Sequence, residues 1–313
     1  MSLTVFFPRL RSVAMPTSGQ DHSIFPSSQP GPFIAHLASL IRLRNQTGTL
    51  LLLLPSLWAL VLASDGNPSP WLLVIFSLGA LFMRSAGVIM NDLADRSFDR
   101  LVTRTKTRPL ASGDLRPIHA LLFLGVLLLL AVGLLAFLNR LTVWLSLIAL
   151  GLAAIYPFTK RFFHVPQFFL GLAFGWGAVM AWAATRNQLE PSAWLLFAAT
   201  ICWALAYDTI YALQDRNDDI RVGVKSSAIF FGSYVWVAVG IIEIVMIAFL
   251  CVAGWLEHLN LAFYGVIAGL AGFLSQQVWR LKTDVTPSEA FAMFKQHVGV
   301  GLVILAGIWL GTL

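Results

Sequence analysis

Charged residues are scarce in this chain of 313 residues, because Asp, Glu, Lys and Arg together account for only 12% of it. A soluble domain has about 25% charged residues. Here 58% of the residues are hydrophobic and the mean hydropathy is +0.78. The composition therefore excludes an ordinary soluble domain and indicates an integral membrane protein.

Cysteine and histidine are also few, and their spacing argues against two kinds of site. The two cysteines, Cys202 and Cys251, lie in apolar stretches and form neither a Cys-x-x-Cys pair nor a disulfide framework. The six histidines are scattered without the spacing of zinc ligands. The 21 Lys and Arg residues are spread over short loops and not along one basic helix, which argues against nucleic acid as a partner.

The beginning of the chain differs in composition from the rest. Residues 1–32 are rich in Ser, Pro and Gln, which predicts a disordered tail, and residues 33–313 form the predicted membrane domain. Within that domain, residues 33–44 carry apolar side chains at helical spacing, followed by two arginines. This pattern is typical of an amphipathic helix that lies at the membrane surface.

Nine apolar runs are long enough to cross a hydrocarbon core of about 30 Å, which predicts an all-α, polytopic bundle of nine transmembrane helices. They are residues 47–64, 71–90, 118–138, 141–158, 166–184, 191–213, 228–254, 259–279 and 297–313. Two Gly-x-x-x-Gly pairs, Gly171 with Gly175 and Gly265 with Gly269, predict close packing between helices.

The basic residues predict the orientation of this bundle. With the N-terminus in the cytoplasm, the inside segments beside the spans carry 16 Lys and Arg residues, whereas the outside loops carry only Arg140 and Arg186. Such asymmetry is typical of cytoplasmic loops. We expect a multi-pass protein of the bacterial inner membrane with a cytoplasmic N-terminus, and keep an organelle membrane as the alternative.

Acidic residues gather in two similar segments at the ends of the second and sixth predicted spans. Seven of the 15 acidic residues lie there: Asp92, Asp95, Asp99, Asp208, Asp215, Asp218 and Asp219. Both segments contain Asp-Arg-x-x-Asp, with first residues 95 and 215, and both are followed by basic residues. The arrangement indicates a weak internal repeat that brings two acidic faces together across the bundle.

The spacing within each segment predicts a shared helix face, because residues three or four apart lie above one another. The first face consists of Asn91, Asp95 and Asp99, and the second of Asp208, Tyr211, Asp215 and Asp219. Two opposed acidic faces repel unless a cation lies between them.

Mg²⁺ suits such a site, since it prefers oxygen ligands and is commonly shared with a substrate phosphate. Neighbouring Arg and Lys side chains can neutralise the rest of a diphosphate. The predicted chemistry is ionisation of a diphosphate ester, with the metal ion stabilising the leaving group. The competing interpretation is that these acids are solvated loop charges that balance basic neighbours.

Three stretches resemble the UbiA superfamily of intramembrane prenyltransferases. Asn91 to Asp99 with the following run Arg104 to Gly113 resembles its first signature, and Ala206 to Asp219 with Gly223 to Ile229 resembles its second. The stretch Tyr156 to Trp176 is most similar to the 4-hydroxybenzoate polyprenyltransferase branch. The family often has Asp-Lys-Pro-x-Gly where this chain has Arg44-Asn-Gln-Thr-Gly48, which weakens any role taken over for that helix.

The resemblance implies a reaction and a set of residues. A central cavity binds a polyprenyl diphosphate, whose polyprenyl group is transferred to the ring carbon next to the hydroxyl of 4-hydroxybenzoate, in ubiquinone or plastoquinone biosynthesis. Asn91, Asp95, Asp99, Asp215 and Asp219 are the implied catalytic residues, and the four aspartates are the Mg²⁺ ligands. The implied substrate-binding residues are Arg84, Lys106, Tyr156, Lys160, Arg161, Asp208, Tyr211, Arg216 and Lys225.

Several of these residues also have a structural interpretation. Arg84 lies inside a span and either faces a polar cavity, with diphosphate or the aromatic carboxylate as its partner, or has a structural role, extending to the membrane surface or pairing with another side chain. Lys160 and Arg161 either contact substrate or anchor the end of a span. Tyr156 either contacts the cation or the phenol, or belongs to the interfacial aromatic belt.

Two alternative functions remain at this point. One is a UbiA-type prenyltransferase with another aromatic acceptor, homogentisate or a naphthoate. The other is a secondary transporter, although transporters usually place their sites near the midplane on broken helices, whereas these acids lie at the ends of spans. The bilayer and the two substrates are the expected partners, and no obligate protein partner is inferred.

Overall fold

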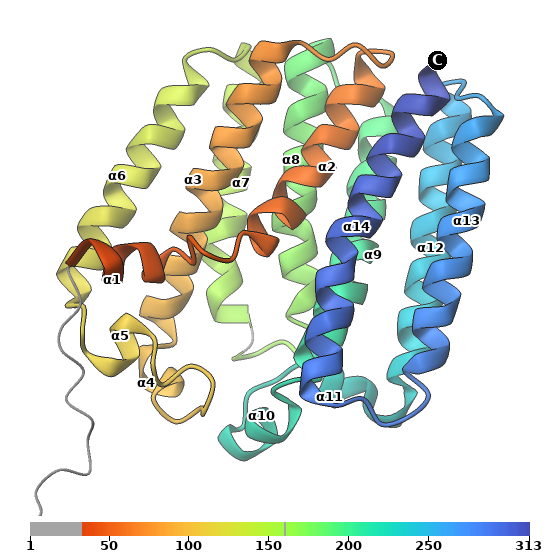
Figure 1. The fold of residues 1–313 in the computed structure, drawn as a ribbon. Helices are drawn as coiled ribbons and strands as arrows, with labels where there is room; N and C mark the ends of the chain where they lie inside the picture. Colours follow the sequence, from red (N-terminus) through yellow and green to blue (C-terminus); the bar gives the residue numbers. More distant parts are fainter. Residues whose placement is uncertain (1–32, 160) are drawn as a thin grey trace, which may run out of the picture. The chain divides into compact units, whose positions relative to one another are not determined.

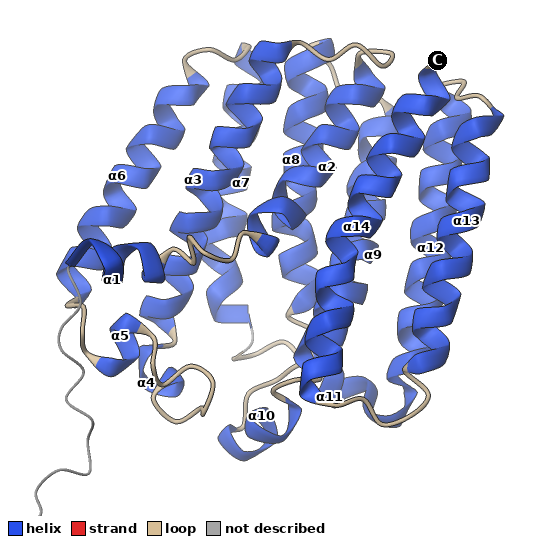
Figure 2. Ribbon diagram, in the orientation of Figure 1, coloured by secondary structure: helices blue, strands red, loops and turns tan. Residues whose placement is uncertain are grey.

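The computed structural model describes residues 33–159 and 161–313, and all regular structure within these ranges is helical (Figures 1 and 2). The predicted tail, residues 1–32, and the predicted substrate-binding residue Lys160 lie outside the described residues.

The helices follow the chain in the order expected from the apolar runs. They are α1 (Phe33–Leu40), α2 (Thr47–Ala63), α3 (Pro70–Ala94), α4 (Arg96–Asp99), α5 (Pro109–Ser112), α6 (Pro117–Leu135), α7 (Arg140–Thr159), α8 (Gln167–Arg186), α9 (Pro191–Ala212), α10 (Arg216–Val222), α11 (Ser227–Phe231), the 3₁₀ turn η1 (Gly232–Tyr234), α12 (Val235–Leu256), α13 (Leu261–Arg280) and α14 (Pro287–Thr312).

The all-α membrane bundle is confirmed, but the count of nine spans is not fully confirmed. Within the described ranges, eight helical segments are long and apolar enough to cross a membrane, and one of them joins α11, η1 and α12 over residues 227–256. The remaining predicted span, residues 47–64, corresponds to α2, an apolar helix of 17 residues, which is shorter than the other eight.

The last span begins about ten residues earlier than predicted from the apolar run 297–313, at Pro287. Thr286 accepts a hydrogen bond from the backbone N–H of Glu289, whose carboxylate accepts one from the N–H of Thr286. This capping box, with Pro287 in the first turn, starts the helix in a polar sequence. Hydropathy alone misses such a start because the first turns of α14 are not apolar.

α9 lies within the bundle and contacts α8 on one side and α12 on the other (Figure 1). α2 packs between α8 and α14, and α13 packs against α12 and α14. The core where these helices meet contains three fully buried tryptophans, Trp58, Trp182 and Trp203. α3 carries α6 on one face and also contacts α2, α7 and α8. The short helices α4, α5, α10 and α11 lie at one end of the bundle (Figure 1).

Close packing is confirmed for one of the two predicted glycine pairs. A Cβ added to Gly171 would lie 2.9 Å from the Cα of Ile201, and one added to Gly175 would lie 2.9 Å from the Phe197 ring, so α8 and α9 approach closely there. The prediction was wrong for Gly265 and Gly269, where an added Cβ meets nothing within 4 Å.

We expect Gly171→Leu to destabilise the protein, because its side chain would push against the backbone of α9, which cannot move aside. Overpacking of this kind costs about 1–3 kcal/mol of folding free energy. The midpoint of thermal unfolding in detergent should fall for Gly171→Leu and stay at or above the parent value for Gly265→Leu. Equal midpoints for the two variants would contradict the close approach of α8 and α9.

Candidate active site

A cavity of about 810 Å³ opens between α2, α3, α6, α7, α8 and α9, and both acidic segments line it. The part of the cavity at the C-terminal ends of α3 and α9 and at α4 is polar. The deeper part of the cavity is lined by apolar residues such as Phe76, Leu135 and Leu150. The cavity therefore joins a charged region at one end of the bundle to an apolar region within it.

The two acidic segments have the same local backbone. Asp95 has φ −97° and ψ 2°, and Asp215 has φ −102° and ψ 5°. Each begins a short helix, α4 or α10, and its carbonyl accepts a hydrogen bond of 2.8 Å from the N–H of the second aspartate, Asp99 or Asp219. The predicted repeat is therefore present in the local structure of the two segments.

The same backbone corrects one detail of the prediction. Asn91, Asp95 and Asp99 were expected on one continuous helix, but α3 ends at Ala94 and the chain turns at Asp95 before α4 begins. In the second segment, α9 ends at Ala212, before Asp215. The carboxylates still line one cavity, because each helix ends at the cavity wall.

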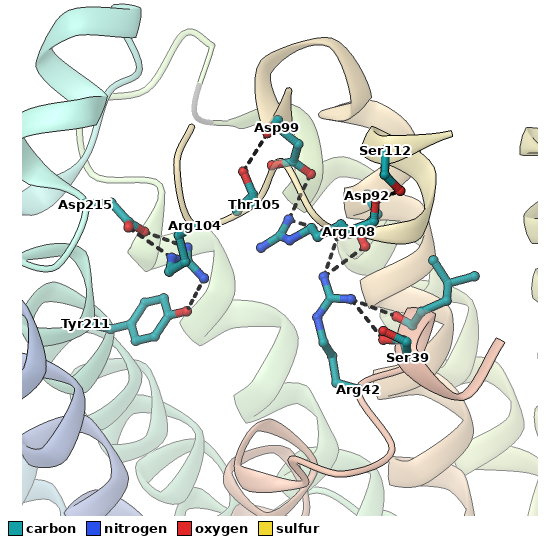
Figure 3. Close-up of polar contacts among 11 residues, drawn as sticks. Ser39, Arg42, Asp92, Asp99, Arg104, Thr105, Arg108, Ser112, Tyr211 and Asp215 are labelled. Carbon is teal, nitrogen blue, oxygen red and sulfur yellow. Dashed lines mark hydrogen bonds and ion pairs between the residues drawn. The ribbon is translucent and has the colours of Figure 1, made fainter. Parts of the chain in front are cut away.

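Arginines compensate the acids of the first segment (Figure 3). Asp92 is 1% exposed and accepts hydrogen bonds from Arg42 at 2.8 and 2.9 Å and from Arg108 at 3.0 Å. The same Arg108 nitrogen donates to Asp99 at 2.9 Å. Arg42 also donates to the carbonyls of Ser39 and Leu40, so it connects the end of α1 to the site.

Arg104 joins the two acidic segments directly (Figure 3). It follows the first segment in sequence, but its guanidinium donates to both carboxylate oxygens of Asp215, at 3.0 and 2.6 Å, and to the Tyr211 hydroxyl at 3.1 Å. Burial lowers the pKa of Arg104, but the hydrogen bond to Asp215 and the charges around it outweigh burial and raise that pKa above its ordinary value. The bridging guanidinium therefore stays charged.

Arg84 lies deeper in the cavity, on α3. No hydrogen bond or ion pair joins its guanidinium to another residue in the described part of the chain. It lies within electrostatic range of Asp208 and of the Tyr156 hydroxyl. A Cβ added to Gly48 of α2 would lie 2.4 Å from Arg84 Nε, so the glycine leaves the space that this side chain fills. The cavity-facing interpretation of Arg84 therefore fits the structure better than an Arg that extends to the membrane surface.

Most of the site residues expected from the sequence line this cavity. They are Arg84, Asn91, Asp95, Asp99, Tyr156, Asp208, Tyr211, Asp215, Asp219 and Lys225. Lys106, Arg161 and Arg216 do not line it. Arg161 instead donates to the Ala94 carbonyl at 2.9 Å and so links the segment after α7 to the end of α3.

Several residues of the cavity wall were not among the predicted site residues, although Arg104 and Arg108 were expected as basic neighbours of the first segment. Arg104 and Arg108 stand four apart in the basic run after the first segment, and that spacing was a usable signal. Arg42 and Tyr207 gave none, because Arg42 reaches Asp92 across 50 positions of sequence and Tyr207 is one aromatic residue among many.

The donor set fits a divalent cation in chemical type, since both segments present carboxylate oxygens to one cavity. It is not gathered as a ready coordination sphere: among the described residues, no three His, Cys, Asp or Glu side chains lie close enough together to hold a metal ion. Arginines hold Asp92, Asp99 and Asp215 instead. A metal ion could thus be bound only if some of these ion pairs open.

Comparison with solved structures identifies the fold. A UbiA homologue from Aeropyrum pernix K1 superposes with a TM-score of 0.70 at 23% identity, over 83% of this chain and 96% of that one. A UbiA homologue from Archaeoglobus fulgidus, bound to GPP and Mg²⁺, superposes with a TM-score of 0.62 at 16% identity, over 87% and 99%.

Comparison with known sequences is more specific. The 4-hydroxybenzoate octaprenyltransferase of Hydrogenovibrio crunogenus is 48% identical over 88% of this chain and 96% of its own length. The enzyme of the same name from Pectobacterium carotovorum is 43% identical over 90% and 97%. The model of the UbiA prenyltransferase family matches residues 52–298, so the chain belongs to that family.

Proposed function

We propose that this protein is a 4-hydroxybenzoate polyprenyltransferase. It transfers a polyprenyl group from polyprenyl diphosphate to the ring carbon ortho to the hydroxyl, in ubiquinone or plastoquinone biosynthesis. The observation that carries the proposal is the pair of matched acidic segments, joined by Arg104 at the polar end of a cavity whose other end is apolar. The names of the relatives at 43–48% identity support the choice of acceptor.

The polar end is the proposed diphosphate site. Asp95, Asp99, Asp215 and Asp219 would hold Mg²⁺, which supplies positive charge that stabilises the diphosphate as it leaves. The Archaeoglobus fulgidus homologue bound to GPP and Mg²⁺ supports this use of a divalent cation. Asn91 lies one turn before Asp95 and offers a further polar group to the same region.

The arginines have a second role in this proposal. With Asp99 and Asp215 holding a metal ion, Arg104 and Arg108 would be available to donate to diphosphate oxygens, which guanidinium groups bind well, while Arg108 would keep its pair with Asp92. Lys225, which lines the cavity and donates to the Phe162 carbonyl at 3.1 Å, is placed to contribute a further cation. Tyr211, whose hydroxyl accepts a hydrogen bond from Arg104, would position that side chain.

The acceptor occupies the part of the cavity around Arg84. Arg84 holds the carboxylate of 4-hydroxybenzoate, with Asp208 and Tyr156 beside it. The allylic C–O bond breaks, diphosphate leaves with the bonding electrons, and the ring carbon forms the new C–C bond before its proton is lost. The surrounding apolar helices exclude water, which would otherwise capture the allylic cation.

The location of the protein is part of the proposal. The basic loops favour the bacterial inner membrane, with the N-terminus and both acidic segments on the cytoplasmic side. Residues 33–313 would form the prenyltransferase domain, preceded by the tail 1–32. In this orientation a water-soluble aromatic acid enters from the cytoplasm, whereas the polyprenyl chain stays among apolar side chains.

We expect prenylated 4-hydroxybenzoate to form from geranyl diphosphate in liposomes only when Mg²⁺ is present. Asp95→Asn and Asp215→Asn should each lower kcat by about 100-fold or more, because they remove charge that acts on the leaving group. Asp114→Asn, an exposed carboxylate after the same basic run, is the matched control and should behave as the parent. Product from homogentisate or a naphthoate, and none from 4-hydroxybenzoate, would instead identify another acceptor.

Arg84→Lys should raise the KM for 4-hydroxybenzoate by about tenfold or more, because lysine keeps the charge beside Asp208 but lacks the planar pair of donors. The KM for geranyl diphosphate should not change. Gly48→Ala should also raise the KM for 4-hydroxybenzoate and leave the KM for geranyl diphosphate unchanged, since its methyl group displaces the Arg84 guanidinium. Gly125→Ala, where an added Cβ meets nothing, is the control. A raised KM for the diphosphate alone would assign Arg84 to that substrate.

A further inference from the structure

Tyr207 of α9 is a cavity residue with an unsatisfied hydroxyl. Its side chain is 1% exposed, and its hydroxyl makes no hydrogen bond within the described part of the chain. It lines the same cavity as Arg84 and Asp208 and lies within electrostatic range of both. Buried hydroxyls are nearly always paired, so an unpaired one in a cavity wall indicates a group that a ligand satisfies.

The ring of Tyr207 is held in place by other aromatic rings. Trp203 packs edge-on at 5.2 Å between centroids and 84° between planes. His297 lies at 5.7 Å and Phe294 at 5.8 Å, both from α14. The hydroxyl therefore owes its position to ring packing and not to a hydrogen bond of its own.

A buried chain of hydrogen bonds fixes these rings in turn. Trp203 Nε1 can only donate, so His297 Nδ1 accepts at 3.1 Å, and the imidazole proton lies on Nε2, which donates to Gln277 Oε1 at 3.0 Å. Trp203 and His297 are both fully buried. The chain connects α9, α14 and α13, and rotating either ring would leave buried polar atoms unpaired.

We propose that Tyr207 is a further substrate-binding residue, whose hydroxyl donates a hydrogen bond to the carboxylate of the aromatic acceptor beside Arg84. Trp203 and His297 are positioning residues that hold it there. This inference rests on the proposed function. The Tyr207 hydroxyl would be a neutral hydrogen-bond donor beside the cationic Arg84 guanidinium.

The chemistry of the neighbours selects the carboxylate as the partner. Arg84 has only donors, and no described residue pairs with it, so the missing group must be an acceptor of more than one hydrogen bond. A carboxylate meets this requirement, and so would a diphosphate, which the proposed function assigns to the region of Asp95, Asp99, Asp215 and Asp219 instead. The allylic cation does not meet it, since the charge of Arg84 would repel it.

Tyr207→Phe tests the hydroxyl and keeps the ring packing. The KM for 4-hydroxybenzoate should rise by about ten- to a hundredfold, the range for a lost hydrogen bond to a charged group, with the KM for geranyl diphosphate unchanged. Tyr234→Phe is the matched control, since Tyr234 is 70% exposed. A Tyr207→Phe variant with parental constants, or one with only the diphosphate KM raised, overturns the proposal.

An uncharged prenyl acceptor tests whether the Tyr207 hydroxyl contacts the carboxylate. With 4-hydroxybenzamide, which lacks the carboxylate charge, the parent and Tyr207→Phe should differ far less than with 4-hydroxybenzoate. An equal difference with both acceptors would place the hydroxyl elsewhere. Product formation by the parent tests the proposed function. The KM of Tyr207→Phe relative to that of the parent tests the role of Tyr207, so the two proposals can fail separately. A parent without any product contradicts both.

The positioning residues need a readout that lost stability would not give. His297→Leu should raise the KM for 4-hydroxybenzoate in the parent but not further in Tyr207→Phe, because the hydroxyl it positions is already gone. His297→Asn keeps an acceptor for Trp203 and should restore much of the loss. An equal increase in both backgrounds would mean that His297 acts only on general packing.

Discussion

The carboxylates at one end of the apolar bundle impose the constraint on which the rest of the site depends. A charge removed from water needs a partner nearby, and breaking one buried pair costs about 3–5 kcal/mol. Asp92 shows how the protein meets this constraint, since it is 1% exposed and bound by two arginines from different parts of the chain. The connections among α1, α3 and the loop before α5 follow from this one pairing.

The same constraint accounts for the shape of the backbone at the site. α3 and α9 do not continue as straight helices through the acidic segments. The turns at Asp95 and Asp215 instead start short helices that fold back, so that a loop residue, Arg104, reaches across from the first segment to the second. The two segments thus share a backbone conformation that places their carboxylates beside cationic side chains, and not only a sequence pattern.

The sequence was sufficient for those features that depend on local pattern. Apolar runs gave the helices, and the spacing of Asp95, Asp99, Asp215 and Asp219 placed both acidic segments at one cavity. Prediction from the sequence failed where a helix cap sets a boundary that hydropathy does not show, as at Thr286. It also failed where a contact joins distant segments, as between Arg42 and Asp92. The role of Gly48 beside Arg84 could not be predicted either, because a missing side chain leaves no signal of what fills its space.

Charge balance links the ion pairs to the proposed reaction. Among the described residues that line the cavity, Asp92, Asp95, Asp99, Asp208, Asp215 and Asp219 are opposed by Arg42, Arg84, Arg104, Arg108 and Lys225, so the cavity wall is close to neutral. A bare diphosphate would add several negative charges to this low-dielectric region and be repelled. A diphosphate bound together with a divalent cation would bring its own compensation and would leave the charge balance of the cavity nearly unchanged. A near-neutral wall therefore favours the metal complex of the substrate over either component alone.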